Sequence, residues 1–197
     1  MTFSEAKKAA REALKYNYGE AILISFIYSI AMSMLSAVGG IGYLLFGSLG
    51  LVCYYNSLIL GSQNRKFKVD DLFTPITLDS IPNRIALSAL KTLYTFLWSI
   101  LFIIPGIIKS YSYMLAELIS LQRPDMSANE CITESRRLMN GHKMNMFILR
   151  LSFIGWDILC ILTCGIGYIF LIPYINQTMI EYIDANIVQL KDTQTII

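Results

Sequence analysis

The sequence predicts an all-α protein that crosses a membrane six times in three hairpins, with both termini in the cytoplasm. Hydrophobic residues make up 55% of the 197 residues and charged residues only 15%, whereas soluble domains average about 45–50% and about 25%. Six long apolar segments follow one another, at residues 21–38, 41–60, 85–104, 107–121, 146–163 and 166–183. Outside these segments, positive charge is confined to the two terminal regions and to alternate connections. Together these observations predict a single polytopic membrane domain over residues 1–197.

The distribution of positive charge sets the predicted orientation. The connections at residues 39–40, 105–106 and 164–165 hold no charged side chain. The N-terminal region and the other connections hold Lys7, Lys8, Arg11, Lys15, Arg65, Lys66, Lys68, Arg84, Arg123, Arg136, Arg137, Lys143 and Lys191. Because short segments rich in Lys and Arg stay on the cytoplasmic side, the uncharged connections are expected to face outward.

The lengths of the apolar segments match those of membrane spans, with one exception. A helix needs about 20 residues, with a range of about 17–25, to cross the hydrocarbon. Segment 107–121 is shorter, so it either crosses with local thinning of the bilayer or only re-enters it. A cleavable signal peptide is disfavoured, because the charged region before residue 21 is long and has its own helical pattern.

The N-terminal region is predicted to form a basic amphipathic helix on the cytoplasmic membrane surface. Thr2 and Glu5 occupy the positions of a capping box. Apolar residues then recur at helical spacing, and basic residues occupy the other side. The basic residues expected to contact anionic lipid headgroups in this helix are Lys8, Arg11 and Lys15.

A second helix of this kind is predicted after the fourth apolar segment. Ser127 and Glu130 repeat the capping-box pattern, and the Asn-Gly pair at residues 140–141 predicts the end of the helix. Here the residues expected to contact headgroups are Arg136, Arg137 and Lys143.

These two helices begin similar stretches of sequence. At a constant offset, Thr2 corresponds to Ser127 and Glu5 to Glu130, and the sequence Gly-Ile-Gly-Tyr occurs at both 40–43 and 165–168. The pattern predicts an internal repeat of residues 2–59 in residues 127–184, with a central hairpin at 85–121. Chance matching within apolar sequence is the alternative.

Five polar residues inside the apolar segments form a candidate site. Charged side chains within the hydrocarbon cost about 2.5–3.5 kcal/mol each, so they normally face a partner or water. The predicted intramembrane polar cluster consists of Lys91, Thr95, Lys109, Glu117 and Asp157.

Structural roles compete with this interpretation. Lys109 and Glu117 are close enough to the membrane surfaces to reach headgroups or water. Asp157 could form a structural ion pair with Lys91 or Lys109.

Catalytic and metal-binding patterns are missing from the sequence. The single histidine, His142, lies in a predicted turn, and Cys160 and Cys164 lack the further ligands that a metal site requires. We therefore expect no enzymatic activity, no cofactor and no metal. The net charge of +2 indicates anionic inner-leaflet lipids as partners rather than nucleic acid.

Several short motifs together resemble a known family. They are AREALK at 10–15, IIPGIIKSYSY at 103–113, SRRLMNGHK at 135–143, LSFIGW at 151–156 and LIPY at 171–174. With these motifs the chain resembles, over nearly its whole length, the bacterial integral-membrane family called domain of unknown function 975. The resemblance implies a bacterial cytoplasmic membrane; it implies no activity, substrate or site residues.

The sequence favours a non-enzymatic, membrane-embedded binding or transport module with a polar interior. The alternative is an envelope interaction, assembly or immunity-type membrane protein that acts through a protein partner. Its basic surface helices and a ridge of small residues, Ser25, Ser29 and Ser33, also suit contact with a membrane protein partner or a second copy.

Overall fold

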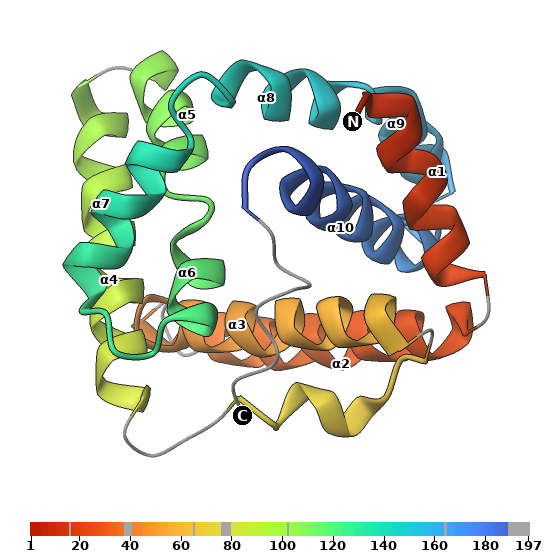
Figure 1. Cartoon of the computed structure of the whole chain (residues 1–197), viewed down its shortest axis with the longest axis horizontal. Coiled ribbons are helices and arrows are strands. Elements are labelled where there is room, and N and C mark those ends of the chain that lie inside the picture. The colour runs from red at the N-terminus through yellow and green to blue at the C-terminus, as the bar shows by residue number, and fades with distance from the viewer. Residues whose placement is uncertain are drawn as a thin grey trace. The chain divides into compact units, whose positions relative to one another are not determined.

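The computed structural model describes residues 1–15, 17–37, 41–64, 66–75, 80–101, 103–163 and 165–188. Within these ranges every regular element is a helix and none is a strand, so the all-α prediction is confirmed (Figure 1). The elements are α1 (Phe3–Leu14), α2 (Tyr18–Ala37), α3 (Ile41–Asn64), the 3₁₀ helix η1 (Val69–Leu72), α4 (Ile81–Leu101), α5 (Ile103–Ser112), α6 (Ala116–Gln122), α7 (Ala128–Leu138), α8 (Lys143–Leu151), α9 (Ile154–Leu162) and α10 (Gly167–Asn186).

Two helical stretches in the described chain are long and apolar enough to cross a membrane. They are Tyr18–Ala37, which is α2, and Lys143–Leu162, which contains α8 and α9. Most of each stretch is exposed, including large apolar side chains such as Phe26, Met34 and Ile161. They overlap the first and fifth of the six predicted spans. The support that the structure gives to a membrane location therefore comes from these two stretches.

The packing divides the chain into two compact units, a division that the sequence does not indicate. The first unit contains Met1–Tyr28, Tyr54–Leu72 and Met144–Ile197, and the second contains Ser29–Cys53 and Phe73–Lys143. Helices α2 and α3 therefore contribute residues to both units. Each unit is described by itself below.

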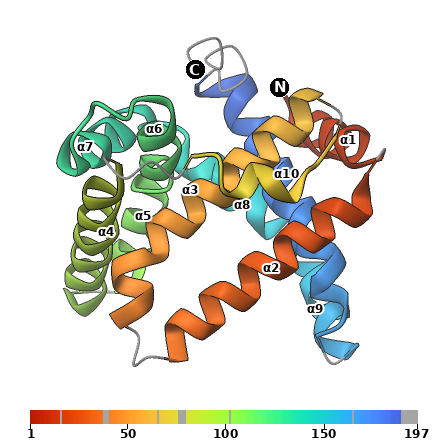
Figure 2. The same ribbon diagram turned by 90° about the horizontal axis from the view of Figure 1, so that it is seen from below.

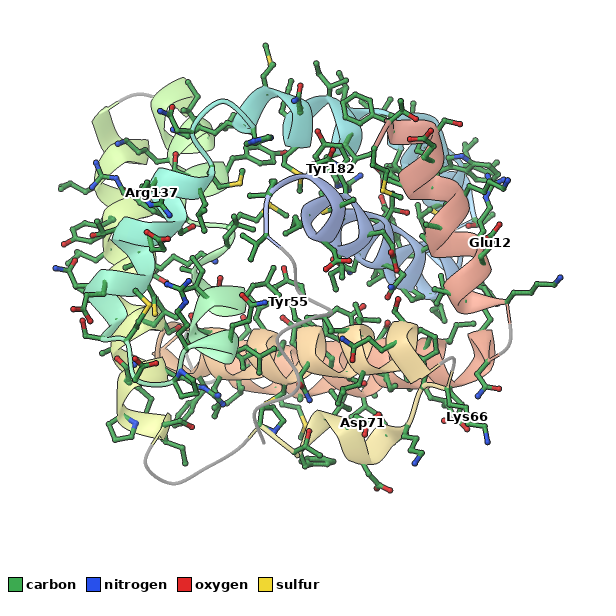
Figure 3. The ribbon with its side chains drawn as sticks, in the orientation of Figure 1. Glu12, Tyr55, Lys66, Asp71, Arg137 and Tyr182 are labelled. Atoms are coloured by element: carbon green, nitrogen blue, oxygen red, sulfur yellow. The ribbon has the colours of Figure 1, made fainter. Side chains whose placement is uncertain are left out.

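In the first unit, α1 lies antiparallel to α10 and beside it (Figure 1). The N-terminal amine bonds Asn186 Oδ1 at 2.8 Å, and the Phe3 and Tyr182 rings lie 5.5 Å apart. A later residue of α1 thus contacts an earlier residue of α10, as expected for antiparallel helices. Figure 3 shows Tyr182 on α10, and Glu12 on the side of α1 that faces away from that helix.

The apolar face of α1 is covered by protein. Ala6 and Ala10 have no exposed surface, and Leu14 is 4% exposed. Small side chains let two helix backbones approach closely, which explains why alanines line the face against α10. The apolar face of α1 is thus covered by α10, and the basic side is the one left exposed.

A hydrogen-bonded tyrosine lies in the core of the first unit. The Tyr54 hydroxyl lies 2.9 Å from Ser25 Oγ and accepts a bond from Asn176 Nδ2 at 3.3 Å. Its ring stacks on Tyr28 with centroids 4.7 Å apart. Ser25 thus joins α2 to α3 by a polar contact inside an apolar core, which satisfies the buried hydroxyl groups.

The predicted fifth span is interrupted by a turn at residues 152–153. Phe153 is fully buried at this turn, with the Lys7 ammonium 4.3 Å from its ring centroid. Lys7 also donates to the Ser152 carbonyl at 3.4 Å. The end of α8 and the start of α9 are therefore fixed by α1, through contacts that sequence periodicity does not reveal.

In the second unit, α4, α5, α6 and α7 pack together (Figure 2). The predicted fourth span is interrupted at residues 113–115, between α5 and α6. Ser135 of α7 lies at this break, where its Oγ accepts from the Leu115 N–H at 3.2 Å and donates to the Ser112 carbonyl at 2.9 Å. The break is stabilised because the backbone groups that it leaves without helical partners are satisfied.

Both predicted capping boxes are confirmed. Thr2 N–H donates to Glu5 Oε2 at 2.7 Å, and Glu5 N–H donates to Thr2 Oγ1 at 3.3 Å. The corresponding distances for Ser127 and Glu130 are 2.7 Å and 3.4 Å. The hydrogen bonds from the Ser127 hydroxyl and N–H lower the pKa of the Glu130 carboxyl.

The helix bounds recur at the offset of the proposed repeat. Helix α1 begins at residue 3 and α7 at residue 128; α2 covers Tyr18–Ala37, and the α8–α9 stretch covers Lys143–Leu162. The two stretches able to cross a membrane therefore occupy equivalent positions 125 residues apart (143 − 18 = 125 and 162 − 37 = 125).

Close helix contacts recur at the same offset. A Cβ on Gly42 would lie 2.4 Å from the Leu35 carbonyl oxygen, and one on Gly167 would lie 2.7 Å from Cys160 Sγ. Gly42 corresponds to Gly167 and Leu35 to Cys160. In each hairpin a glycine at the start of the returning helix permits the backbones to approach.

Candidate functional site

A polar cavity in the second unit contains three of the five residues of the predicted cluster. Its volume is about 360 Å³, within the range of about 300–1,000 Å³ for small-molecule sites. It is lined by Gly47, Ser48 and Leu51 of α3, by Ser88, Lys91, Thr92, Thr95 and Phe96 of α4, by Ser110 of α5 and by Glu117 of α6.

An ion pair lies at this cavity. Lys91 Nζ is 2.6 Å from Glu117 Oε1, and the side chains are 23% and 1% exposed respectively. Ser48 Oγ donates to the same carboxylate oxygen at 3.2 Å. Charge-assisted hydrogen bonds of this kind fix the position of the carboxylate more firmly than neutral ones.

The other carboxylate oxygen of Glu117 is uncommitted. Glu117 Oε2 is buried and has no hydrogen-bond partner in the described part of the protein. A buried acceptor without a partner is costly, and in native proteins it calls for an explanation such as a bound molecule. The cavity therefore offers a fixed acceptor to a solute that carries a hydrogen-bond donor.

Local structure explains how these side chains meet. Ser88, Lys91 and Thr95 are separated by three and four residues, so they share one face of α4. The break after α5 places Glu117 in the first turn of the separate helix α6. Since Ser135 stabilises that break, it helps to position Glu117 without touching the cavity.

The predicted cluster is therefore brought together only in part. Lys91, Thr95 and Glu117 line one cavity, whereas Lys109 of α5 does not line it. The sequence-based alternative that Glu117 reaches water does not fit a side chain that is 1% exposed.

Asp157 belongs to the first unit and has a partner that was not expected. Arg150 Nη1 lies 2.7 Å from Asp157 Oδ2, and Nη2 lies 3.4 Å from Oδ1. Lys91 and Lys109 were considered as ion-pair partners from the sequence, whereas the partner found in the first unit is Arg150. Arg150 precedes Asp157 by seven residues, two helical turns, and this spacing was the signal that could have identified it.

The residues expected to contact headgroups are mostly exposed. Lys8, Lys15, Arg136 and Arg137 are exposed, and Lys143 is half-buried. Arg137 forms an ion pair with Glu134 at 2.6 Å.

Arg11 is exposed as well, and its Nε donates to the Tyr174 hydroxyl at 3.0 Å. These positions leave basic groups on the surface, where contact with anionic headgroups requires them.

Several cavity residues lie outside the predicted cluster, and among them Ser48 bonds Glu117. It lies next to Gly47 within the second apolar segment, at residues 41–60. A buried small-polar pair at that position was an available signal, since serine within a span usually faces another helix. Among the described residues, no group of three or more His, Cys, Asp or Glu side chains is arranged to hold a metal ion.

Part of the chain matches a known protein family. Residues 100–189 match the family described as "Protein of unknown function (DUF975)". These residues belong to that family. The match covers less of the chain than the motifs suggested, because residues before 100 lie outside it. No curated protein and no solved structure gives a significant match.

The cavity combines residues from inside and outside the DUF975 domain. Ser110 and Glu117 belong to the domain, whereas Ser48, Ser88 and Lys91 precede it. Glu117, which carries the oxygen without a partner, is thus a residue of the DUF975 domain. Its ion-pair partner Lys91 lies on α4, before the first residue of the domain.

Proposed function

We propose that this protein is a bacterial integral membrane protein with six crossings and cytoplasmic termini. The two membrane-length stretches, Tyr18–Ala37 and Lys143–Leu162, support a membrane location. Their equivalent positions in the proposed repeat give both the same direction of crossing, since parallel repeats share one orientation. The basic connections then all lie on the cytoplasmic side.

This topology has a direct test. Fusions after residues 62 and 187 are expected to give active reporters in the cytoplasm, whereas a fusion after residue 163 is expected to report from the exterior. Activity of the residue-187 fusion on the outside would contradict the proposed even number of crossings.

Within this protein, the proposed role of the cavity is to bind, and pass across the membrane, a small polar solute with a hydrogen-bond donor. The observation that carries the proposal is Glu117 Oε2, a buried acceptor without a partner beside a cavity. A charged ammonium donor would satisfy it best, because a charge-assisted hydrogen bond to a carboxylate is stronger than a neutral one. Lys91 offsets the charge of Glu117, which suits a zwitterionic or singly charged solute rather than a multivalent ion.

Binding and transport are proposed rather than catalysis. The ionisable groups that line the cavity are the two members of one ion pair. The other polar groups there are hydroxyls on α3, α4 and α5, which are suited to hydrogen bonding with a solute.

The experiment compares matched solutes on the full chain in lipid nanodiscs. Ethanolamine, glycine and methylammonium carry an ammonium donor; ethylene glycol is a neutral compound of similar size. At 100 times its Kd, a ligand stabilises the folded state by about 2.7 kcal/mol. This corresponds to an increase in Tm of about 5–10 °C for a chain of this size.

Glu117→Gln is expected to abolish the increase in Tm. Because this change leaves Lys91 without its partner, the neutral pair Lys91→Gln with Glu117→Gln serves as a second variant, and it should also show no increase. Glu134→Gln removes an ion pair on the exposed surface of α7 and should keep the wild-type response.

Two results would overturn the assignment of the cavity. One is a Tm that none of the ammonium compounds changes; the other is an equal increase in the wild type and in both Glu117 variants. Uptake of labelled ethanolamine into proteoliposomes then separates transport from binding alone.

A further inference from the structure

The first unit contains a second and larger cavity, separate from the polar one. Its volume is about 770 Å³, and residues of α1, α2, α9 and α10 line it. Most of the lining is apolar, and none of the described residues that line it is acidic. The cavity is therefore suited to a large apolar group.

The apolar part opens on an exposed surface. Trp156 and Leu159 of α9 and Phe170 of α10 line the cavity and are 54%, 50% and 52% exposed. Trp156 and Leu159 belong to Lys143–Leu162, one of the two stretches able to cross a membrane. An acyl chain of the surrounding bilayer could thus enter the cavity from the side.

Another part of the lining is basic. Arg11 and Lys15, on the last turn of α1 and just after it, line the cavity. Arg11 uses Nε to bond the Tyr174 hydroxyl at 3.0 Å, and no described residue bonds its terminal nitrogens. The exposed Lys15 adds a second positive charge, so an anion here would meet two cations and no carboxylate.

We infer that this cavity binds one anionic phospholipid, with an acyl chain along Leu159 and Phe170 and the headgroup phosphate at Arg11 and Lys15. The volume and the charge distribution match this ligand class: about 770 Å³ with a mostly apolar lining and two cations. The inference rests on the proposed membrane location and not on the polar cavity.

Trp156 provides a local probe of the bound lipid. The chain contains two tryptophans, so Trp98→Phe leaves Trp156 alone. The full-length variant is reconstituted in phosphatidylcholine vesicles that contain rising fractions of dibrominated phosphatidylglycerol or, in parallel, of dibrominated phosphatidylcholine. Bromine quenches tryptophan fluorescence at contact, so the two curves give the relative affinity of the site for the anionic lipid.

The expected preference for phosphatidylglycerol is about fivefold or more, since one basic residue near an anionic lipid contributes about that factor. Adding Arg11→Gln and Lys15→Gln should reduce the preference to near unity, and Lys15→Gln alone should reduce it in part. The single variant changes one exposed side chain, so it decides the matter if the double variant does not fold.

Lys8→Gln is the matched control. Lys8 is an exposed lysine on the same helix that does not line the cavity, so the preference should persist. Equal quenching by both lipids would overturn the inference, as would a preference that the double variant retains. A loss as large with Lys8→Gln would also overturn it, because general surface attraction would then explain the result. Quenching by neither lipid would refute the membrane location as well.

Discussion

Replacement of Ser135 by alanine should strongly destabilise the second unit. Its hydroxyl bonds the Leu115 N–H at 3.2 Å and the Ser112 carbonyl at 2.9 Å, across the break between α5 and α6. All three residues are buried, with at most 1% of their surface exposed. Alanine would leave a buried donor and a buried acceptor without partners.

The expected loss follows from those two groups. A buried polar group that loses its partner costs about 1–3 kcal/mol, so the free energy of unfolding should fall by about 2–6 kcal/mol. Loss of the geometry at the break should also displace Glu117 of α6. The increase in Tm with ethanolamine should therefore weaken even where the variant is folded.

Thr133→Ala is the matched control for this prediction. Thr133 is exposed on the same helix, and its hydroxyl donates to the Asn129 carbonyl of its own helix at 2.9 Å. Substitutions of this kind usually change stability by no more than about 0.5 kcal/mol. Unfolding in mixed micelles of mild and denaturing detergent, followed by circular dichroism, measures both variants. A loss below about 1 kcal/mol for Ser135→Ala would refute the proposed role of its hydroxyl.

Two further predictions concern the helix contacts and the caps. Gly167→Ala should destabilise the protein, because the added Cβ would lie 2.7 Å from Cys160 Sγ. Gly155→Ala, whose Cβ would meet no atom within 4 Å, should stabilise the protein by about 0.5–1 kcal/mol. Equal effects of the two variants on Tm would refute the close contact at Gly167. Because the Glu130 pKa is lowered below its ordinary value of 4.5, its contribution to stability is complete above that pH and is lost as the pH falls through the lowered pKa. Glu130→Gln should remove this part of the pH dependence, measured as Tm between pH 3 and 6, and an unchanged slope would contradict it.

The sequence determined the local features because they depend on residues close together in the chain. A capping box requires only two residues three positions apart, and both boxes were predicted correctly. The positions of α1, α2, α4 and α7 follow from periodicity and from the composition of each segment. The polar face of α4 was equally predictable, because Lys91 and Thr95 are one turn apart.

The breaks within the fourth and fifth apolar segments could not be predicted from the sequence. Counting along a segment locates a residue only if the segment is one straight helix that rises 1.5 Å per residue. The breaks at residues 113–115 and 152–153 interrupt two segments, so a count from the segment ends no longer gives the position of Lys109 or Asp157. The breaks are stabilised by Ser135 and by the contacts of Lys7, which belong to helices distant in sequence.

Only the tertiary structure decided which surface covers each apolar face. The hydrophobic effect is not directional, so the alanines of α1 predict burial but do not distinguish a lipid surface from α10. The same holds for Glu117, whose intramembrane position was predicted but whose partner at 2.6 Å and uncommitted oxygen depend on where α3, α4 and α6 meet. Sequence pattern specifies which side chains must avoid water or find a partner, and packing between distant segments selects the partner.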